Sequence, residues 1–228
     1  MQLNRVKAVF IDIDDTLLDF NLCADYSMHC AADAMGITLP NDFLSLFHRI
    51  NNTFWERMER GEITNQEIYD TRFNVIFREA GISADGKLFE KEFKKGLHES
   101  HIPVEGAMDL LEYLSPKYRL FAASNGPYEQ QKYRLSQAGM LHLFEDIFIS
   151  ERIGCSKPMP GFFDVCYSLL RDVSPTETVM IGDSLTSDVA GAHNYGIPTI
   201  WFNKNGKPDC PEEVDFEVTS LSEIKKIL

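Results

Sequence analysis

The sequence is short of positive charge and has no long apolar run. It contains 22 lysine and arginine residues against 35 aspartate and glutamate residues, a formal net charge of −13. This balance argues against a nucleic-acid polymer as partner, because binding its phosphates needs cations. No stretch approaches the roughly 18 apolar residues that span a bilayer, and the first ten residues show no signal-peptide cleavage site. We therefore expect a cytoplasmic protein without a membrane partner, although a local cation or metal could still bind one small anion.

Cysteine and histidine also lack the spacings that mark metal or redox sites. The five cysteines are odd in number, no Cys-x-x-Cys pair occurs, and the six histidines show no metal-ligand spacing. A zinc or redox centre is therefore not expected, and reduced thiols of a cytosolic protein are the simpler interpretation.

The first half of the sequence predicts one strand followed by helices only. The segment from Val6 to Ile13 is apolar and rich in β-branched residues, which is typical of a buried strand. Residues 21–102 carry long helical patterns, such as those from Asn41 to Arg60 and from Asn65 to Ala80. No strand pattern is evident in that stretch. A length of 228 residues is expected to give one large domain or a core with an insert, and 44% hydrophobic residues are enough to bury a core. The change of pattern along the chain favours a core with a helical insert.

After Pro103 strands and helices alternate, which indicates βαβ units and a parallel sheet. We predict strands at 118–124, 146–150, 178–182, 197–202 and 216–219, and helices at 105–114, 127–138, 160–170, 185–195 and from 221 onward. The predicted fold class is therefore α/β. Residues 1–20 and 103–228 form a Rossmann-like catalytic core, and residues 21–102 form an inserted all-helical cap.

Polar side chains follow four of the predicted strands. In open α/β sheets ligands bind beyond the carboxyl ends of the strands, so these side chains are expected to converge on one edge. They are Asp12, Asp14 and Thr16 after the first strand, Ser124, Asn125 and Gly126 after the second, Lys157 beyond the third, and Gly182, Asp183, Ser184 and Asp188 at the fourth.

Each of these residue types has a use in phosphoryl transfer. A carboxylate can act as nucleophile and form an aspartyl-phosphate. Clustered carboxylates need a cation, and Mg²⁺ prefers oxygen ligands. A hydroxyl and free backbone amides can hold phosphate oxygens, and a lysine adds compact positive charge. Taken singly, each residue could instead be a turn residue or a helix N-cap. Their joint order at successive strand ends favours a site.

The chain resembles the haloacid dehalogenase (HAD) superfamily of hydrolases. Four motifs occur in the order of that family, over essentially the whole chain: Asp12-Ile13-Asp14-Asp15-Thr16, Ser124-Asn125-Gly126, Lys157-Pro158, and Gly182-Asp183-Ser184 with Asp188.

The resemblance implies a role for each motif residue. Asp12 would be the nucleophile, and Asp14 the general acid and then the general base. Mg²⁺ would bind to the side chains of Asp12 and Asp183 and to the backbone carbonyl of Asp14. The phosphoryl group would bind to Ser124, to the backbone around Asn125 and Gly126, and to Lys157. Thr16, Ser184 and Asp188 would support the site, with Asp188 steadying Lys157 or a metal-bound water.

The acid at Asp14 favours one chemistry within the superfamily. Its dehalogenases lack an acid there and its phosphonate-cleaving members carry a small residue, whereas an alkoxide leaving group needs the proton. Hydrolysis of phosphate monoesters is therefore expected. A sugar phosphomutase shares the acid pair, so a phosphatase or mutase for a sugar phosphate or another small organic phosphate stays open.

A narrower resemblance concerns the house-cleaning pyrimidine 5′-nucleotidases. It is carried by Leu17-Leu18-Asp19-Phe20, by Gly191-Ala192, and by Ile200-Trp201-Phe202-Asn203. It implies a pyrimidine nucleoside monophosphate as the small phosphorylated substrate. Phe20, Trp55 and Arg72 could contact that substrate, although packing within the cap is the preferred interpretation for Trp55 and Arg72.

A receiver-type phosphoacceptor signalling module is the remaining alternative. Such modules also gather aspartates, a hydroxyl and a lysine at strand ends. They are much shorter than this chain, however, and have no helical insert after the first strand. The sequence leaves open the oligomeric state, the closed geometry of the cap and the physiological ester.

Overall fold

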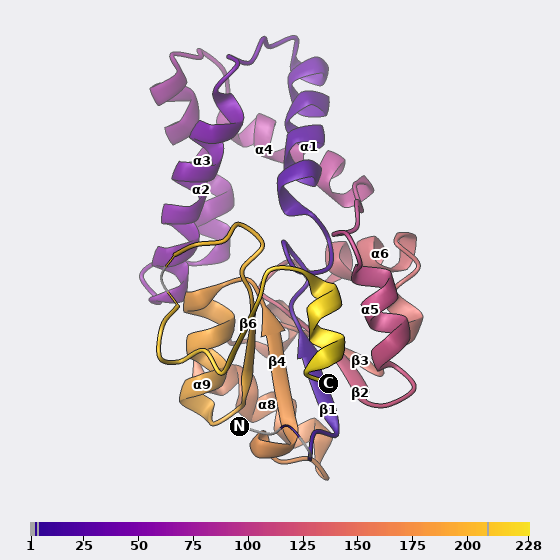
Figure 1. Ribbon diagram of the computed structural model, residues 1–228. Coiled ribbons are helices and arrows are strands. Elements are labelled where there is room, and N and C mark those ends of the chain that lie inside the picture. The colour runs from indigo at the N-terminus through magenta and orange to yellow at the C-terminus, as the bar shows by residue number, and fades with distance from the viewer. Residues whose placement is uncertain (1–2, 4, 209) are drawn as a thin grey trace. The chain divides into compact units, whose positions relative to one another are not determined.

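The computed structural model describes residue 3, residues 5–208 and residues 210–228 (Figure 1). The chain divides into two compact units. The core unit comprises Met1–Asp19 and His101–Leu228, and the helical unit comprises Phe20–Ser100. The expectations for the first residues of the chain fall partly on residues 1, 2 and 4, which lie outside the described residues. No helix within the described residues is long and apolar enough to cross a membrane.

The core unit is built on a six-stranded parallel sheet, as predicted. Its order is β3-β2-β1-β4-β5-β6, so the first strand of the chain lies at the centre. In β1, Ala8 pairs with Arg119 on one side and with Thr178 on the other. The strands are β1 (Ala8–Ile11), β2 (Arg119–Ser124), β3 (Asp146–Ile149), β4 (Thr178–Gly182), β5 (Thr199–Phe202) and β6 (Phe216–Val218).

Helical segments cover both faces of this sheet. Alternate side chains of a strand point to opposite faces, so Val9 and Ile11 pack in one apolar layer while Ala8 and Phe10 pack in another. The first layer includes α5 (Ala107–Leu114), α6 (Tyr128–Gln137) and η4 (Leu221–Lys226), and the second includes α8 (Pro160–Leu170) and α9 (Ala190–Tyr195). The result is the three-layer, Rossmann-like arrangement expected from the sequence (Figure 1).

Some short elements differ from the prediction. The segment predicted as one helix at 185–195 begins as a π-helical turn, η3 (Leu185–Val189), before α9. The closing segment η4 is a 3₁₀ helix rather than an α-helix. Three short elements, α7 (Ser150–Ile153), η1 (Leu141–Leu143) and η2 (Pro175–Glu177), were not predicted, because so few residues show no periodicity.

The helical unit contains four helices, and its residues, all described, form no strand. They are α1 (Phe20–Met35), α2 (Phe43–Glu59), α3 (Asn65–Ala80) and α4 (Gly86–Glu99). Local signals set the limits of α3: Thr64 and Glu67 form a capping box at its start, and Gly81 takes a left-handed conformation at its end. Phenylalanines dominate the core of this unit: Phe43, Phe47, Phe73, Phe77, Phe89 and Phe93.

The two places where the chain leaves and re-enters the core unit are hydrogen-bonded to each other. The backbone N–H of Asp19 donates to the carbonyl of Ile102 at 2.8 Å, and that of Val104 donates to Leu17 at 2.9 Å. Lys204, which follows β5, forms an ion pair with the Asp19 carboxylate. Both chain connections are therefore hydrogen-bonded within the core unit, up to Asp19 on one side and from Ile102 on the other.

Candidate active site

The carboxyl end of β1 places two aspartates in different surroundings. Asp12 continues the strand, because its N–H donates to Ile181 O at 2.9 Å. The chain then forms a tight turn in which Leu17 and Leu18 donate to Ile13 O and Asp15 has a φ of 59°, a conformation that aspartate tolerates. As a result Asp12 is buried, while the side chain of Asp14 is 30% exposed.

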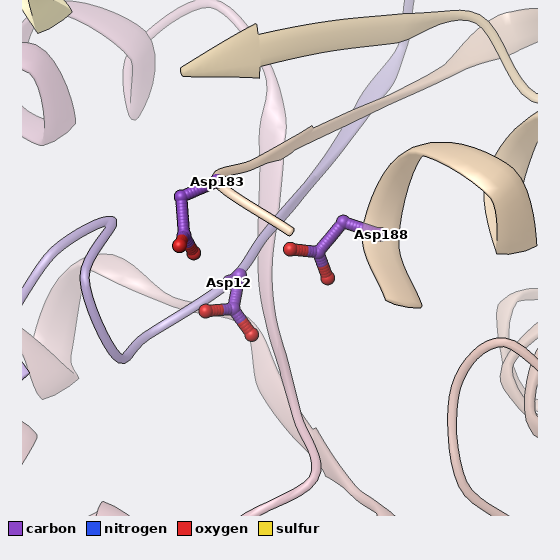
Figure 2. A group of neighbouring side chains, drawn as sticks. All are labelled: Asp12, Asp183 and Asp188. Carbon is purple, nitrogen blue, oxygen red and sulfur yellow. The ribbon is translucent and has the colours of Figure 1, made fainter. Parts of the chain in front are cut away.

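Three carboxylates meet beyond the ends of β1 and β4. Asp12, Asp183 and Asp188 each offer an oxygen, and these oxygens lie within 4.8 Å of one another. Figure 2 shows Asp12 and Asp183 at the ends of their strands and Asp188 on the following helical turn, with the carboxylate groups turned toward one another. Oxygen-only donors at this spacing suit a hard divalent cation such as Mg²⁺.

Lys157 is the cation of this cluster, and its side chain is only 1% exposed. Its Nζ donates to Asp12 Oδ1 at 2.7 Å, to Asp188 Oδ1 at 2.6 Å and to the carbonyl of Ala123 at 2.5 Å. An ammonium has three N–H donors, so these contacts use all of them. The lysine is therefore fixed beside the Asp12 carboxylate.

One ammonium does not balance three carboxylates, and the ionisation of the site reflects this. Burial raises the pKa of Asp12 to about 8, although Lys157 opposes the shift. Burial, followed by the charges of Asp12 and Asp188, also raises the pKa of Asp183 well above its ordinary value. Burial alone would lower the pKa of Lys157, but the neighbouring carboxylates outweigh it and the pKa is raised. The cluster as it stands therefore favours an added positive charge.

Asp188 is fixed by the backbone that follows β4. The N–H of Ser184 donates to Asp188 Oδ2 at 3.2 Å, and the hydroxyl of Ser184 caps the next turn by accepting from Ser187 N at 3.1 Å. A Cβ on Gly182 would lie 2.2 Å from Asp188 Oδ2, so only glycine leaves room for this carboxylate. Thr16 contributes as well, because its hydroxyl donates to Asp183 Oδ1 at 3.3 Å.

The second motif supports the site through side chains as well as backbone. Asn125 Nδ2 donates to the carbonyl of Lys157, and Asn125 Oδ1 accepts from the N–H of Lys157, both at 2.9 Å. The side chain of Asn125 therefore positions Lys157. Ser124 is buried, and its Oγ accepts from the N–H of Gly126 at 3.0 Å.

Two residues around Asp14 were missed by the sequence analysis. Arg134 Nη1 donates to Asp14 Oδ1 at 2.6 Å, and Gln131 Nε2 donates to Asp14 Oδ2 at 2.5 Å. Both lie on α6, three residues apart, and so on the same face of the helix. That spacing, just after the Ser124 motif, was the only available signal, and polar residues at such positions usually face solvent.

The residues proposed for substrate contact outside the motifs lie in the helical unit. The ring of Phe20 stacks on Phe47, with centroids 6.4 Å apart. Arg72 is 3% exposed, and its guanidinium donates to both carboxylate oxygens of Glu90 and to Asn51. The indole of Trp55 also donates to Asn51. These contacts of Arg72 are thus packing contacts within the helical unit, whereas the motif residues meet within the core unit.

Comparison with known proteins gives consistent matches. A model of the haloacid dehalogenase-like hydrolase family matches residues 6–196. The HAD-hydrolase YfnB of Bacillus subtilis is 34% identical over 99% of this chain and 97% of its own length. A crystal structure of YfnB bound to magnesium matches with a TM-score of 0.93, covering 98% of this chain and 99% of that one.

Two further relatives are named as pyrimidine 5′-nucleotidases. The pyrimidine 5′-nucleotidase PynA of Streptococcus pneumoniae is 34% identical over 86% of this chain and 84% of its own. The pyrimidine 5′-nucleotidase YjjG of Escherichia coli is 28% identical over 96% of each chain.

Proposed function

The chain belongs to the haloacid dehalogenase-like hydrolase family, and from this premise we propose that it hydrolyses phosphate monoesters through an aspartyl-phosphate on Asp12. The observation that carries the proposal is the surroundings of Asp12. Its carboxylate ends the central strand, receives a hydrogen bond from Lys157 at 2.7 Å and shares a cluster with Asp183 and Asp188. A nucleophile, a fixed cation and a set of oxygen ligands therefore meet at one point.

We propose Mg²⁺ as the cofactor, bound by Asp12, Asp183 and the backbone carbonyl of Asp14. The donor set fits, because it consists of oxygen atoms and carries more negative charge than Lys157 balances. Asp188 lies close enough to contribute directly or through water. When bound, the ion would neutralise the carboxylates and the phosphoryl oxygens and so let the two approach. The magnesium-bound structure of the relative YfnB supports this assignment.

In the first half of the proposed reaction an Asp12 oxygen forms a bond to phosphorus. The bond from phosphorus to the ester oxygen breaks, its electron pair stays on that oxygen, and the oxygen takes a proton from Asp14. Ser124 would donate its hydroxyl proton to a phosphoryl oxygen. Lys157, fixed by Asn125 and Asp188, would stabilise the developing charge from beside Asp12.

In the second half a water oxygen forms a bond to phosphorus. The bond from phosphorus to the Asp12 oxygen breaks, and its electron pair returns to the Asp12 carboxylate. One proton of the water passes to Asp14, which is thereby restored as an acid for the next turnover. Inorganic phosphate leaves.

The substrate that we propose is a pyrimidine nucleoside 5′-monophosphate. Two relatives named for that activity support it. The core residues serve the phosphate, so contacts to the base and sugar must come from elsewhere. We propose that the helical unit acts as a cap that supplies them, with Phe20 at its start as the first candidate and with hinges at Asp19-Phe20 and at residues 100–103.

The chemistry is tested by replacing the two aspartates of the first motif. Asp12→Asn should form no phosphoenzyme and show no turnover of p-nitrophenyl phosphate. Asp14→Asn should lose about 10²–10⁴-fold in kcat on alkyl esters. With p-nitrophenyl phosphate the leaving group needs little acid, so Asp14→Asn should instead accumulate a trappable phosphoenzyme. Asp109→Asn, on an exposed carboxylate of the core unit, is the matched control. Wild-type turnover by Asp12→Asn would refute the proposal.

The substrate class is tested by steady-state kinetics on UMP, dUMP, dTMP and a panel of sugar phosphates. A pyrimidine nucleotide should have the highest kcat/KM, and Phe20→Ala should raise KM more for that nucleotide than for p-nitrophenyl phosphate. A sugar phosphate with a higher kcat/KM than every nucleotide would instead identify the protein as a sugar phosphatase. An equal rise in KM for the nucleotide and for p-nitrophenyl phosphate would indicate that Phe20 does not contact the base or sugar.

A further inference from the structure

The carboxylate of Asp14 accepts hydrogen bonds from two side chains that are entirely buried. Arg134 and Gln131 are each 0% exposed. Arg134 Nη1 lies 2.6 Å from Asp14 Oδ1, and Gln131 Nε2 lies 2.5 Å from Asp14 Oδ2. Each carboxylate oxygen thus accepts one hydrogen bond from the protein interior. Because a buried guanidinium stays charged and needs a counter-ion, Arg134 ties Asp14 to this place.

The amide of Gln131 joins this pair to the phosphate-binding motif. Its Oε1 accepts from Arg134 Nη1 at 3.0 Å, so its Nε2 faces Asp14 and also lies 2.9 Å from Ser124 Oγ. Ser124 Oγ therefore accepts from Gln131 and from Gly126 N. A hydroxyl has two acceptor sites and one proton. With both sites used, its proton is left to point outward as a donor.

The space around the amide is closed. A Cβ on Gly126 would lie 2.6 Å from Gln131 Nε2, so a larger residue there would displace the glutamine. The side chain of Asp14 remains 30% exposed despite its two inward contacts. Since each carboxylate oxygen can accept more than one hydrogen bond, its remaining capacity faces the solvent side.

We propose that Arg134 and Gln131 are positioning residues that hold Asp14 as the base for hydrolysis of the phosphoenzyme. This inference rests on the proposed function. The water that attacks the aspartyl-phosphate must approach from the solvent side and release its proton to Asp14 as the bond from phosphorus to Asp12 breaks. A carboxylate fixed on its inner side presents its outer side to that water, whereas a free side chain would sample several rotamers.

The test uses p-nitrophenyl phosphate, whose leaving group needs little acid, so that the base step can be followed alone. Arg134→Met should lower kcat by about 10–100-fold. Rapid mixing should show a burst of p-nitrophenolate approaching one equivalent per enzyme, because phosphoenzyme forms but is slow to hydrolyse. Arg134→Lys should recover part of kcat and reduce the burst, since the hydrogen bonds of Arg134 to Asp14 and to Gln131 come from the same nitrogen.

Two controls separate positioning from folding. Arg119→Met removes an arginine of the same unit that pairs with Glu145 and Asp172 near the surface, and it should leave the burst and kcat unchanged. In the double variant Asp14→Asn/Arg134→Met, activity should equal that of Asp14→Asn alone, because Arg134 acts through Asp14. A further loss in the double variant, or a lower kcat without a burst in Arg134→Met, would overturn the inference.

A second variant decides the question if Arg134→Met does not fold. Gln131→Leu keeps the ion pair of Arg134 with Asp14 but removes the bonds of Gln131 to the other Asp14 oxygen, to Ser124 and to Arg134, and it should give the same burst with a smaller loss of kcat. Absence of that burst would overturn the inference. If Asp14→Asn itself loses no activity, the proposed function fails. If Asp14→Asn accumulates phosphoenzyme and neither α6 variant does, the positioning role alone fails.

Discussion

Replacing Arg72 by methionine should lower the free energy of unfolding of the helical unit by about 3–5 kcal/mol, because it leaves Glu90 buried without a counter-ion. The side chains of Arg72 and Glu90 are 3% and 5% exposed. Their two hydrogen bonds are 2.8 and 2.9 Å long. Once Arg72 is replaced, no counter-ion offsets the desolvation of the buried Glu90 carboxylate.

Neighbouring groups place the effect toward the upper end of that range. The guanidinium of Arg72 lies 5.0–5.6 Å from the ring centroids of Phe47, Phe73 and Phe93, and each such contact contributes about 0.5–1 kcal/mol or more when desolvated. Asn51 loses one donor, but the indole of Trp55 still donates to its Oδ1 at 3.2 Å. The asparagine therefore adds little to the loss.

Thermal and urea unfolding of the full chain measure this effect. For a unit of this size, 3 kcal/mol corresponds to a fall in Tm of at least roughly 12 °C. The double variant Arg72→Met/Glu90→Leu should recover most of the stability, because replacing a whole buried ion pair by apolar groups is often neutral. Arg49→Met, which breaks an exposed ion pair with Glu79 in the same unit, should change stability by less than about 1 kcal/mol.

Kinetics of the Arg72→Met variant separate packing from substrate binding. If Arg72 only stabilises the helical unit, the order of substrates by kcat/KM should be the same in Arg72→Met as in the wild type, at a temperature where both are folded. A loss of stability below about 1 kcal/mol, or a double variant no more stable than the single one, would refute the argument from burial. A changed order of substrates would indicate that Arg72 contacts the substrate.

Three further predictions concern the metal, the β4 turn and pH. Activity should vanish with EDTA and return with Mg²⁺ but poorly with Ca²⁺, which prefers more ligands at longer distances; full activity in chelated enzyme would contradict the role of Asp12 and Asp183. Gly182→Ala should lower kcat by at least about tenfold, because its Cβ would lie 2.2 Å from Asp188 Oδ2; unchanged kinetics would exclude a tight fit. Burial lowers the pKa of His48, whose Nε2 has no hydrogen-bond partner among the described residues. The unfolded chain therefore binds the His48 proton more tightly, so the free energy of unfolding should fall as the pH drops below the ordinary histidine pKa of 6.5. His48→Leu should weaken this pH dependence in urea titrations, and an unchanged pH dependence would contradict the prediction.

The strand ends could be predicted from the sequence because they depend on local pattern and a general rule of topology. The apolar run before Asp12 and the strand before Asp183 identify two strands, and parallel strands bring their carboxyl ends to one edge. The structure accordingly places Asp12 and Asp183 in one cluster with Asp188. The resemblance to a known family supplied the proposed role of each.

The supporting contacts could not be predicted, because they join residues far apart in the chain. Arg134 meets Asp14 only after α6 packs on the sheet, and Arg72 meets Glu90 only after α3 and α4 pack together. Charged residues on helices usually face solvent, so the burial of Arg134 was not expected. Packing within the cap was the preferred interpretation for Arg72, but its partner Glu90 could not be identified from the sequence. The π-helical turn that carries Asp188 is also invisible in the sequence, since it depends on the hydrogen bond from Val189 N to Ser184 O.

The central place of β1 has a consequence for the order in which the protein becomes functional during synthesis. A ribosome makes Asp12 well before the hydrogen-bonding partners of β1, which include Arg119 and Thr178. Until β4 has left the ribosome, the strand that leads to Asp12 has an open edge, which is prone to wrong pairing. The helical unit is translated entirely between β1 and its partner strands. It can form its own core before β1 is paired. Asp12, the proposed nucleophile, is therefore translated early but reaches its working surroundings late, and nascent chains that end before β4 should be inactive and in need of protection from aggregation.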